Sequence, residues 1–321
     1  MSFLSYFNPY SGETLLGFLW QFILRMWQFL SGKMTSNEFV SDEIQVFVLC
    51  GVAASSALVG TFLVLRKMTM LANSLSHTIL VGIVIAFLWT YYTSHDRPET
   101  GYLSIHILLA ASFFMGIATT FLTQFLTKGA RLQEDASTGI VFTSLFAFGV
   151  IAITLLTRNV HIGTEAVMGN VDALQLHDCR LVYLVLGINL LLFILFFQEF
   201  KITTFDAGLS RSFGISPTFF NYLLMTQVSF TAIAAFRAVG VLMVLAFITG
   251  PVLTARLLVS TLKQTLAVSI GIGIAASFIG VALSRHLLTV FDLSLSTAGI
   301  VVCVLVLFYL TAALYAHIVK K

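Results

Sequence analysis

Residues 44–65 read I-Q-V-F-V-L-C-G-V-A-A-S-S-A-L-V-G-T-F-L-V-L, and no charged side chain interrupts them. An α-helix of this length crosses the hydrocarbon core of a bilayer, which is about 30 Å thick. Further apolar runs of comparable length lie near 69–91, 103–126, 139–157, 181–199, 238–258, 264–284 and 294–318. The pattern predicts a polytopic membrane protein built from helices.

The composition supports this prediction. Of the 321 residues, 58% are hydrophobic and 10% are charged, whereas a soluble domain carries about 25% charged residues. Thirty phenylalanines and four prolines suit long apolar helices, while a β-barrel would show short alternating segments. The net charge of +3 comes without a basic tract, so no nucleic-acid partner is expected. The cysteines Cys50, Cys179 and Cys303 lie far apart, which predicts neither a disulfide framework nor a thiolate metal site.

Two segments are shorter or more polar than the others. Residues 14–30 contain polar and charged side chains, so this segment either spans the membrane or lies in its interface. Residues 219–236 are separated from the next run only by Arg237. The sequence therefore predicts an all-α integral membrane protein, a bundle of eight to ten transmembrane helices. An N-terminal segment, residues 1–43, would carry one marginal helix and precede a transmembrane domain over 44–321.

The charges predict an orientation. With ten spans and a cytoplasmic N-terminus, ten Lys and Arg residues fall on the inner side and six on the outer side, in agreement with the positive-inside rule. Acids and histidines are more frequent on the outer side, where they either attract cations or a basic partner or are simply solvated. No loop has room for a soluble catalytic domain and no G-x-x-x-x-G-K-[ST] loop occurs. A pump of this type would need another chain for ATP hydrolysis.

A polar pair lies inside the second run, in M-T-M-L-A-N-S-L-S-H-T-I-L-V-G, residues 68–82. Asn73 and His77 are one helical turn apart and therefore share a helix face. An imidazole and an amide oxygen could ligate zinc, manganese or iron transiently, as a conduit requires. Alternatively, His77 hydrogen-bonds a neighbouring helix, and both interpretations stay open. Asn189 and Gln227 stand alone in other runs, which predicts helix–helix hydrogen bonds.

Residues 199–217, E-F-K-I-T-T-F-D-A-G-L-S-R-S-F-G-I-S-P, interrupt two apolar runs on the predicted inner side. Phe205, Leu209 and Phe213 recur every four residues, which predicts one apolar stripe on a short helix. The polar neighbours of the stripe and the residues that end the helix are Asp206, Ser210, Arg211, Gly214 and Pro217. Such a helix suits a groove on another protein or the surface of a membrane, and the pattern leaves both open.

Four stretches, in order, resemble the membrane permease subunits of bacterial ATP-binding-cassette importers for zinc, manganese or iron. The most specific is F-L-V-L-R-K-M-T-M-L-A-N-S-L-S-H-T-I-L-V-G, residues 62–82, which is similar to the family stretch LRRM-x-LxGDALSHAxLPG. The others are N-V-H-I-G-T-E-A-V-M-G-N-V-D-A-L (159–174), F-D-A-G-L-S-R-S-F-G (205–214) and R-A-V-G-V-L-M-V-L-A-F-I-T-G-P-V-L-T-A-R-L-L (237–258). The resemblance runs from about Val46 to Leu258, and residues 1–43 contribute little.

The resemblance implies a transporter subunit and not an enzyme. Two permeases would form a pore in the bacterial cytoplasmic (inner) membrane, separate ATPase subunits would bind beneath it, and an extracytoplasmic metal-binding protein would deliver the ion. A divalent metal would be the cargo, with no permanently bound cofactor. Residues of about 203–217 would be the cytoplasmic coupling helix. Its contacts with the ATPase would come from Phe205, Asp206, Leu209, Arg211, Phe213 and Gly214.

In the family, the aspartate and histidine of GDALSH face the translocation path and are associated with the metal. His77 matches the histidine, but Asn73 replaces the aspartate and Val81 replaces the proline. Loss of the carboxylate removes an attraction worth several kcal/mol in a low dielectric, an order of magnitude only. We therefore expect this chain to pair with a second permease that keeps the aspartate.

Other classes of protein make different predictions. A secondary metal transporter or channel would work without ATPases and would need carboxylates inside its spans, and the clearest runs contain none at depth. A membrane metalloenzyme would need several converging ligands, for example H-E-x-x-H, which is absent. A vitamin or siderophore permease would lack the N-S-L-S-H signature. Metal import is the interpretation that the sequence favours.

Overall fold

The computed structural model describes residues 9–10, 12–34, 38–69, 78, 81–82, 84–85, 105–157 and 171–319. Within these ranges, six helices are long and apolar enough to cross a membrane. They are α2 (Ser41–Leu65), α7 (Leu176–Leu195), α10 (Pro217–Val239), α11 (Val241–Leu258), α12 (Leu262–Phe291) and α13 (Thr297–Val319). The predicted all-α membrane bundle is therefore confirmed.

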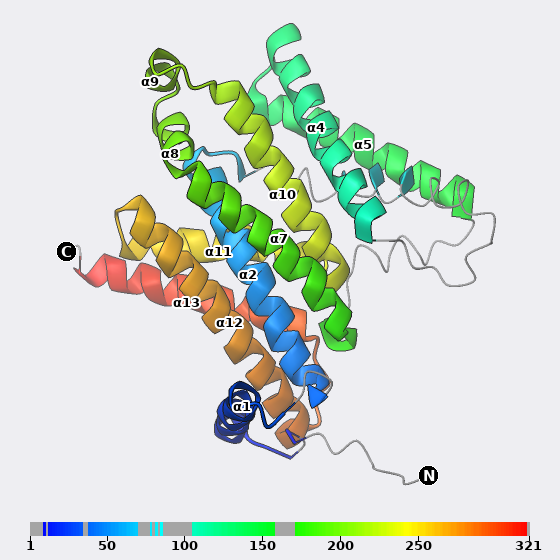
Figure 1. Cartoon of the computed structure of the whole chain (residues 1–321), viewed down its shortest axis with the longest axis vertical. Helices are drawn as coiled ribbons and strands as arrows, with labels where there is room; N and C mark the ends of the chain where they lie inside the picture. Colours follow the sequence, from blue (N-terminus) through cyan, green and yellow to red (C-terminus); the bar gives the residue numbers. More distant parts are fainter. Residues whose placement is uncertain are drawn as a thin grey trace.

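Two further long helices, α4 (Ile105–Gly129) and α5 (Glu134–Thr157), coincide with predicted apolar runs. Helix α4 packs against α10 and α5 packs against α4. Figure 1 shows this pair on the side of α10 that faces away from α12 and α13. Most of the predicted run at 69–91 lies outside the described residues.

Helix α2 is the centre of the bundle and contacts α7, α10, α11 and α12. Small side chains fill its middle, including Ala53, Ser56 and Ala57, all of which are buried. Small residues let helices approach closely in a membrane, where apolar burial alone does not drive helix association. At its far end, the ring of Phe62 stacks on Phe193 of α7 with centroids 4.8 Å apart.

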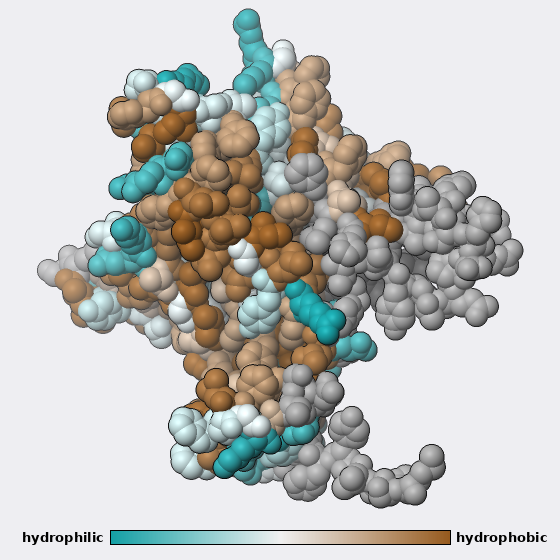
Figure 2. All heavy atoms as spheres, in the orientation of Figure 1, coloured by the Kyte–Doolittle hydropathy of each residue, from teal (hydrophilic) through white to brown (hydrophobic). Residues whose placement is uncertain are grey.

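The bundle has two distinct ends. One carries α8 (Phe197–Phe205) and α9 (Ala207–Ser212), close to the C-terminal end of α2. The other carries the first turn of α2, the last turns of α12 and the short 3₁₀ helix η2 (Val171–Ala173). In Figure 2, brown apolar side chains cover the middle of the visible face and teal polar side chains gather toward its ends.

Helix α1 (Leu15–Leu30) answers the question that the sequence leaves open for residues 14–30. Figure 1 shows it nearly along its axis, whereas α2 and α12 run across the picture. It therefore lies across the bundle and does not run beside the spanning helices. Its charged side chain, Arg25, pairs with the buried Glu43 in the first turn of α2. A transverse helix allows this pairing, while a spanning one would carry the charge into the hydrocarbon.

Candidate functional site

The α8–α9 segment holds the residues predicted to form a coupling helix. The sequence predicts one continuous helix there, but the structure divides it at Asp206, whose backbone is extended (φ −148°, ψ 97°). The Asp206 carboxylate accepts hydrogen bonds from the backbone N–H groups of Gly208 and Leu209, both at 2.9 Å. Aspartate is a favoured N-cap because its oxygen satisfies these free N–H groups. The expectation of one helix carrying Phe205, Leu209 and Phe213 is therefore wrong, because α8 ends at Phe205 and Asp206 caps a new helix, α9.

Helix α9 ends in a compact glycine turn. The N–H of Ile215 donates to the carbonyl of Ser210 at 2.9 Å, and the N–H of Gly214 donates to that of Arg211 at 3.0 Å. This pair of bonds is a Schellman motif, and it needs a left-handed residue, which Gly214 supplies with φ +74°. Ser216 then caps α10, accepting from the N–H of Phe219 at 3.4 Å. Both ends of α9 are thus fixed by local hydrogen bonds.

The three apolar side chains of the predicted stripe are all exposed. Phe205 is 62%, Leu209 48% and Phe213 66% exposed. We call these three residues the coupling face. Brown side chains are visible in Figure 2 at the end of the molecule where Figure 1 places α9. Asp206 and Arg211 are also exposed. The structure thus presents an apolar face with charged neighbours at one end of the bundle.

Arg66 joins the end of α2 to this segment. Its guanidinium donates to Thr204 Oγ1 at 3.0 Å, to Thr203 Oγ1 at 2.9 Å and to Asn221 Oδ1 at 3.5 Å. Burial lowers the pKa of Arg66 to about 10, so it remains charged near neutral pH. One side chain therefore connects α2, α8 and α10. Arg66 also lies within residues 62–82, the stretch with the most specific resemblance to the family, although its spacing there does not predict this role.

The predicted metal ligands Asn73 and His77 lie outside the described residues. The residues that follow them are partly described. Thr78 is buried and accepts a hydrogen bond from Thr119 of α4 at 3.3 Å. A Cβ atom at Gly82 would lie 2.9 Å from the side chain of Met115, also on α4. The chain immediately beyond His77 therefore packs against α4.

A buried polar cluster joins α2, α7 and α10. The amide nitrogen of Asn189 donates to Ser55 Oγ at 2.8 Å and to Thr231 Oγ1 at 2.7 Å. This confirms the helix–helix hydrogen bonds predicted for Asn189. The prediction for Gln227 is wrong, because its fully buried side-chain amide has no hydrogen-bond partner among the described residues. Among the described residues, Asn189 Oδ1 likewise has no partner, so the cluster could form further hydrogen bonds.

At the opposite end, two of the acids that the sequence predicts to be solvated or cation-attracting, Asp42 and Glu43, are buried and paired, while Asp172 is exposed. Asp42 pairs with Arg285 of α12, and Asp172 accepts a hydrogen bond from Thr297 at 2.7 Å. These residues line a polar hollow of about 330 Å³. Together with the Glu43–Arg25 pair, they tie helices from distant parts of the sequence.

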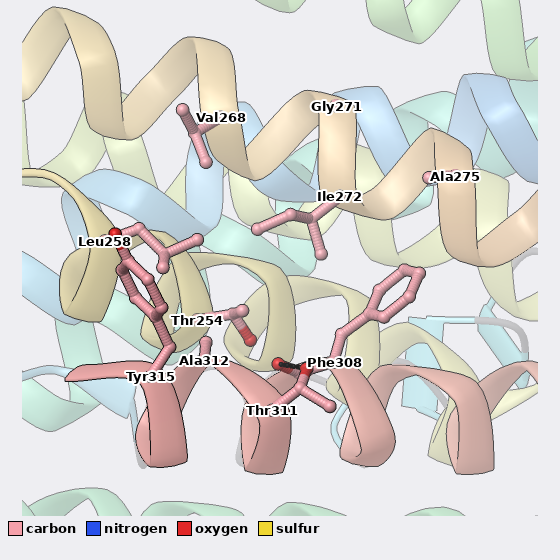
Figure 3. A pocket seen from close by; sticks show the side chains of 10 residues that line it. All are labelled: Thr254, Leu258, Val268, Gly271, Ile272, Ala275, Phe308, Thr311, Ala312 and Tyr315. Atoms are coloured by element: carbon pink, nitrogen blue, oxygen red, sulfur yellow. Dashed lines mark hydrogen bonds between the residues drawn. The ribbon is translucent and has the colours of Figure 1, made fainter. Parts of the chain in front are cut away.

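The side of the bundle carries an apolar groove of about 620 Å³ between α11, α12 and α13. In Figure 3, the side chains lining it are aliphatic or aromatic except for two threonines. Thr311 donates to the carbonyl of Phe308 and Thr254 to that of Gly250. The lining that the structure describes includes no carboxylate, imidazole or thiol side chain, so the groove does not suit a metal ion. Among the described residues, no group of three or more His, Cys, Asp and Glu could hold a metal.

A model of the ABC 3 transport family matches residues 37–316. The chain belongs to the ABC 3 transport family. A "Probable metal transport system membrane protein" of Chlamydia muridarum is 40% identical over 307 residues, covering 94% of this chain and 93% of that protein. The manganese transport system membrane protein MntD of Bacillus subtilis is 36% identical over 247 residues, or 73% of this chain and 79% of that protein.

A solved structure of the same architecture is PsaBC from Streptococcus pneumoniae in complex with Fab. It matches with a TM-score of 0.71 at 23% identity and covers 89% of this chain and 95% of that chain. This likeness shows the fold. The ABC 3 family member described here is thus a multi-pass membrane protein of a transport family.

Proposed function

We propose that this chain is the permease subunit of an ATP-binding-cassette importer that moves divalent manganese, zinc or iron across the bacterial cytoplasmic membrane. The family match and the names of the relatives support this proposal. The observation that carries its mechanism is the coupling face, because three exposed apolar side chains on a firmly capped turn suit the groove of a partner protein. The protein that carries this groove would be a separate ATPase chain.

Arg66 supplies a route by which movement of the turn reaches the bundle. It holds Thr203 and Thr204 of α8 to the end of α2, the helix at the centre of the fold. A displacement of α8 and α9 on ATP binding would therefore be transmitted to α2 and α10. In this mechanism, closure of the ATPases opens the spans outward, and hydrolysis returns them to the inward-facing state. The end with α9 is the cytoplasmic one.

His77 and Asn73 are proposed to contact the cargo transiently on the translocation path. A neutral imidazole and an amide bind a dehydrated divalent ion weakly, which lets it leave again. We expect His77→Ala to reduce metal uptake more than it reduces assembly. Thr311→Ala, in the apolar groove, is the matched control and should leave uptake unchanged. Equal uptake by His77→Ala and the parent would show that the histidine is structural.

The absence of a carboxylate at Asn73 supports pairing with a second, different permease. Two copies of this chain would offer imidazoles and amides but no negative charge at that level. The mixed pair would supply the missing aspartate from the other subunit. Purification of the complex from its native membrane tests this directly. A homodimer with full metal transport would contradict the proposal.

Reconstitution in vesicles tests whether the complex transports metal. The complex is placed in vesicles with the metal-binding protein outside and ATP inside, and uptake of manganese, zinc and iron(II) is followed. We expect uptake that requires ATP and the ATPase chains. Uptake that persists without ATPases and follows a proton gradient would instead identify a secondary transporter. The metal that competes with the others at the lowest concentration is the one that the importer binds most tightly.

A further inference from the structure

Helix α1 presents an exposed face made entirely of apolar side chains. Leu16, Trp20, Ile23, Trp27 and Leu30 are each between 60% and 80% exposed. Their spacing of four, three, four and three residues places them on one side of the helix. Two of the three tryptophans in the chain belong to this face. We call these five residues the tryptophan face.

The opposite side of α1 is fixed to the bundle. Phe18 is fully buried, and Phe22 packs edge-to-face on Phe278 of α12 with centroids 4.8 Å apart. Arg25, the charged residue of this helix, pairs with Glu43 and donates to the carbonyl of Glu38 at 2.9 Å. Tyr10 donates to the same Glu43 carboxylate at 2.7 Å. The tryptophan face therefore points away from the bundle because its other side is held in place.

The depth of α1 along the bundle follows from its ring contacts. Phe22 contacts Phe47 of α2 and Phe278 of α12. At a rise of 1.5 Å per residue, Phe47 lies about 7.5 Å along α2 from Asp42, and Phe278 about 10 Å along α12 from Arg285. The Asp42–Arg285 ion pair marks the polar end of the two helices. Helix α1 thus lies across the outside of the bundle, slightly closer to its middle than the Asp42–Arg285 ion pair.

We propose that α1 is an interfacial helix whose tryptophan face inserts into the lipid leaflet on the side opposite α9. Amphipathic helices lie about 5–10 Å into the boundary between headgroups and acyl chains, a depth similar to the distance along α2 and α12 between the contacts of Phe22 and the Asp42–Arg285 pair. Tryptophan is enriched at that boundary because its ring is largely apolar but carries an N–H donor. The transverse axis of α1 lets the whole face meet one lipid layer. The partner of this surface is phospholipid.

This inference does not depend on the cargo or on the ATPases, and the full chain in vesicles tests it. Trp89→Phe leaves Trp20 and Trp27 as the fluorescent tryptophans. The protein is reconstituted in phospholipid brominated either near the carbonyl end or near the methyl end of the acyl chain. We expect the carbonyl-end bromines to lower emission by about twofold and the methyl-end bromines and aqueous iodide to lower it less. Adding Trp20→Phe to this variant assigns the share of each ring.

A depth reference comes from the same chain. With all three tryptophans changed to Phe, Leu184→Trp places a single indole at an exposed position in the middle of α7, a spanning helix. This reference should be quenched more by the methyl-end bromines. If iodide quenches Trp20 and Trp27 most strongly, the face lies in water and the proposal is wrong. If no reagent quenches them while the reference responds, protein covers the face, which also overturns the proposal.

Discussion

Gly60 of α2 lies against the backbone of Ile248 in α11, and a Cβ atom at Gly60 would stand 2.1 Å from the Ile248 carbonyl oxygen. Backbone cannot move aside as a flexible side chain can. We therefore expect Gly60→Ala to force α2 and α11 apart and to lower the free energy of unfolding by about 1–3 kcal/mol. Thermal unfolding in detergent measures this loss.

The control for this prediction is Gly187→Ala on α7, where an added Cβ meets no heavy atom within 4 Å. Alanine is a better helix former than glycine, so this variant should match or exceed the parent in stability. Equal stability of the Gly60→Ala and Gly187→Ala proteins would contradict the close approach of α2 and α11.

Phe213→Asp tests the coupling face. The substitution adds a charge to a surface that is proposed to enter an apolar groove, so ATP-driven metal uptake should fall by more than tenfold, which corresponds to about 1.4 kcal/mol or more of lost contact. Membrane insertion should be unaffected because Phe213 is exposed. Uptake and co-purification of the ATPase are measured together. Phe291→Asp makes the same change at a similarly exposed position at the other end of the bundle, and it should retain ATPase binding.

Arg66→Met removes the three hydrogen bonds that connect α2 with α8 and α10. We expect a loss of about 1–3 kcal/mol in stability, because two threonine hydroxyls and the Asn221 amide lose a charged partner. Transport should fall further than stability does, while the ATPase remains bound. Uptake per ATP hydrolysed is the measurement. Arg256→Met, at an exposed position in the last turn of α11, is the control. Equal coupling ratios in the two variants would exclude Arg66 from transmission.

Stability should fall at high pH because of Tyr10. Burial and the hydrogen bond to Glu43 raise the pKa of the Tyr10 phenol above its ordinary value. The unfolded chain loses this proton near pH 10, whereas the folded protein keeps it, so stability is full below about pH 10 and declines above it. Tyr10→Phe should flatten this decline between about pH 10 and 11.5. Unfolding temperatures across that range measure it. The exposed Tyr315→Phe is the control, and an identical pH slope in both variants would contradict the prediction.

Gln227 and Asn189 should respond oppositely to replacement by leucine. Gln227→Leu removes a buried amide without a partner and should raise the free energy of unfolding by about 1–3 kcal/mol. Asn189→Leu deprives Ser55 and Thr231 of their donor and should lower it by a similar amount. Chemical denaturation of both variants in the same detergent gives the comparison. A destabilised Gln227→Leu protein would show that the amide is satisfied in the membrane.

The helices could be predicted from the sequence because the bilayer permits few alternatives. Backbone N–H and C=O groups in hydrocarbon must be satisfied within the segment, so an uninterrupted apolar run such as residues 44–65 becomes a helix. The partners of Asn189 were similarly predictable, since an amide in such a run favours a partner on another helix. The same rule failed for Gln227. The roles proposed for Asn73 and His77 remain predictions.

The local division of the coupling segment was harder to predict. The four-residue spacing of Phe205, Leu209 and Phe213 suits one helix, and it conceals the break at Asp206. The signal was present in the sequence, because an aspartate followed by small residues is a favoured helix start. The periodicity predicted one helix and the capping residue predicted two, and the structure has two. The exposure of all three side chains required the fold.

By itself, the sequence determined that this protein is a bundle of membrane helices with a short polar insert, because hydropathy and backbone hydrogen bonding act within each segment. Only the tertiary structure decided that α1 lies across the bundle, that Arg66 reaches α8, and that Asp42 pairs with Arg285. These contacts join residues far apart in the chain. Each depends on how helices pack in three dimensions, and side-chain spacing along one helix does not contain that information.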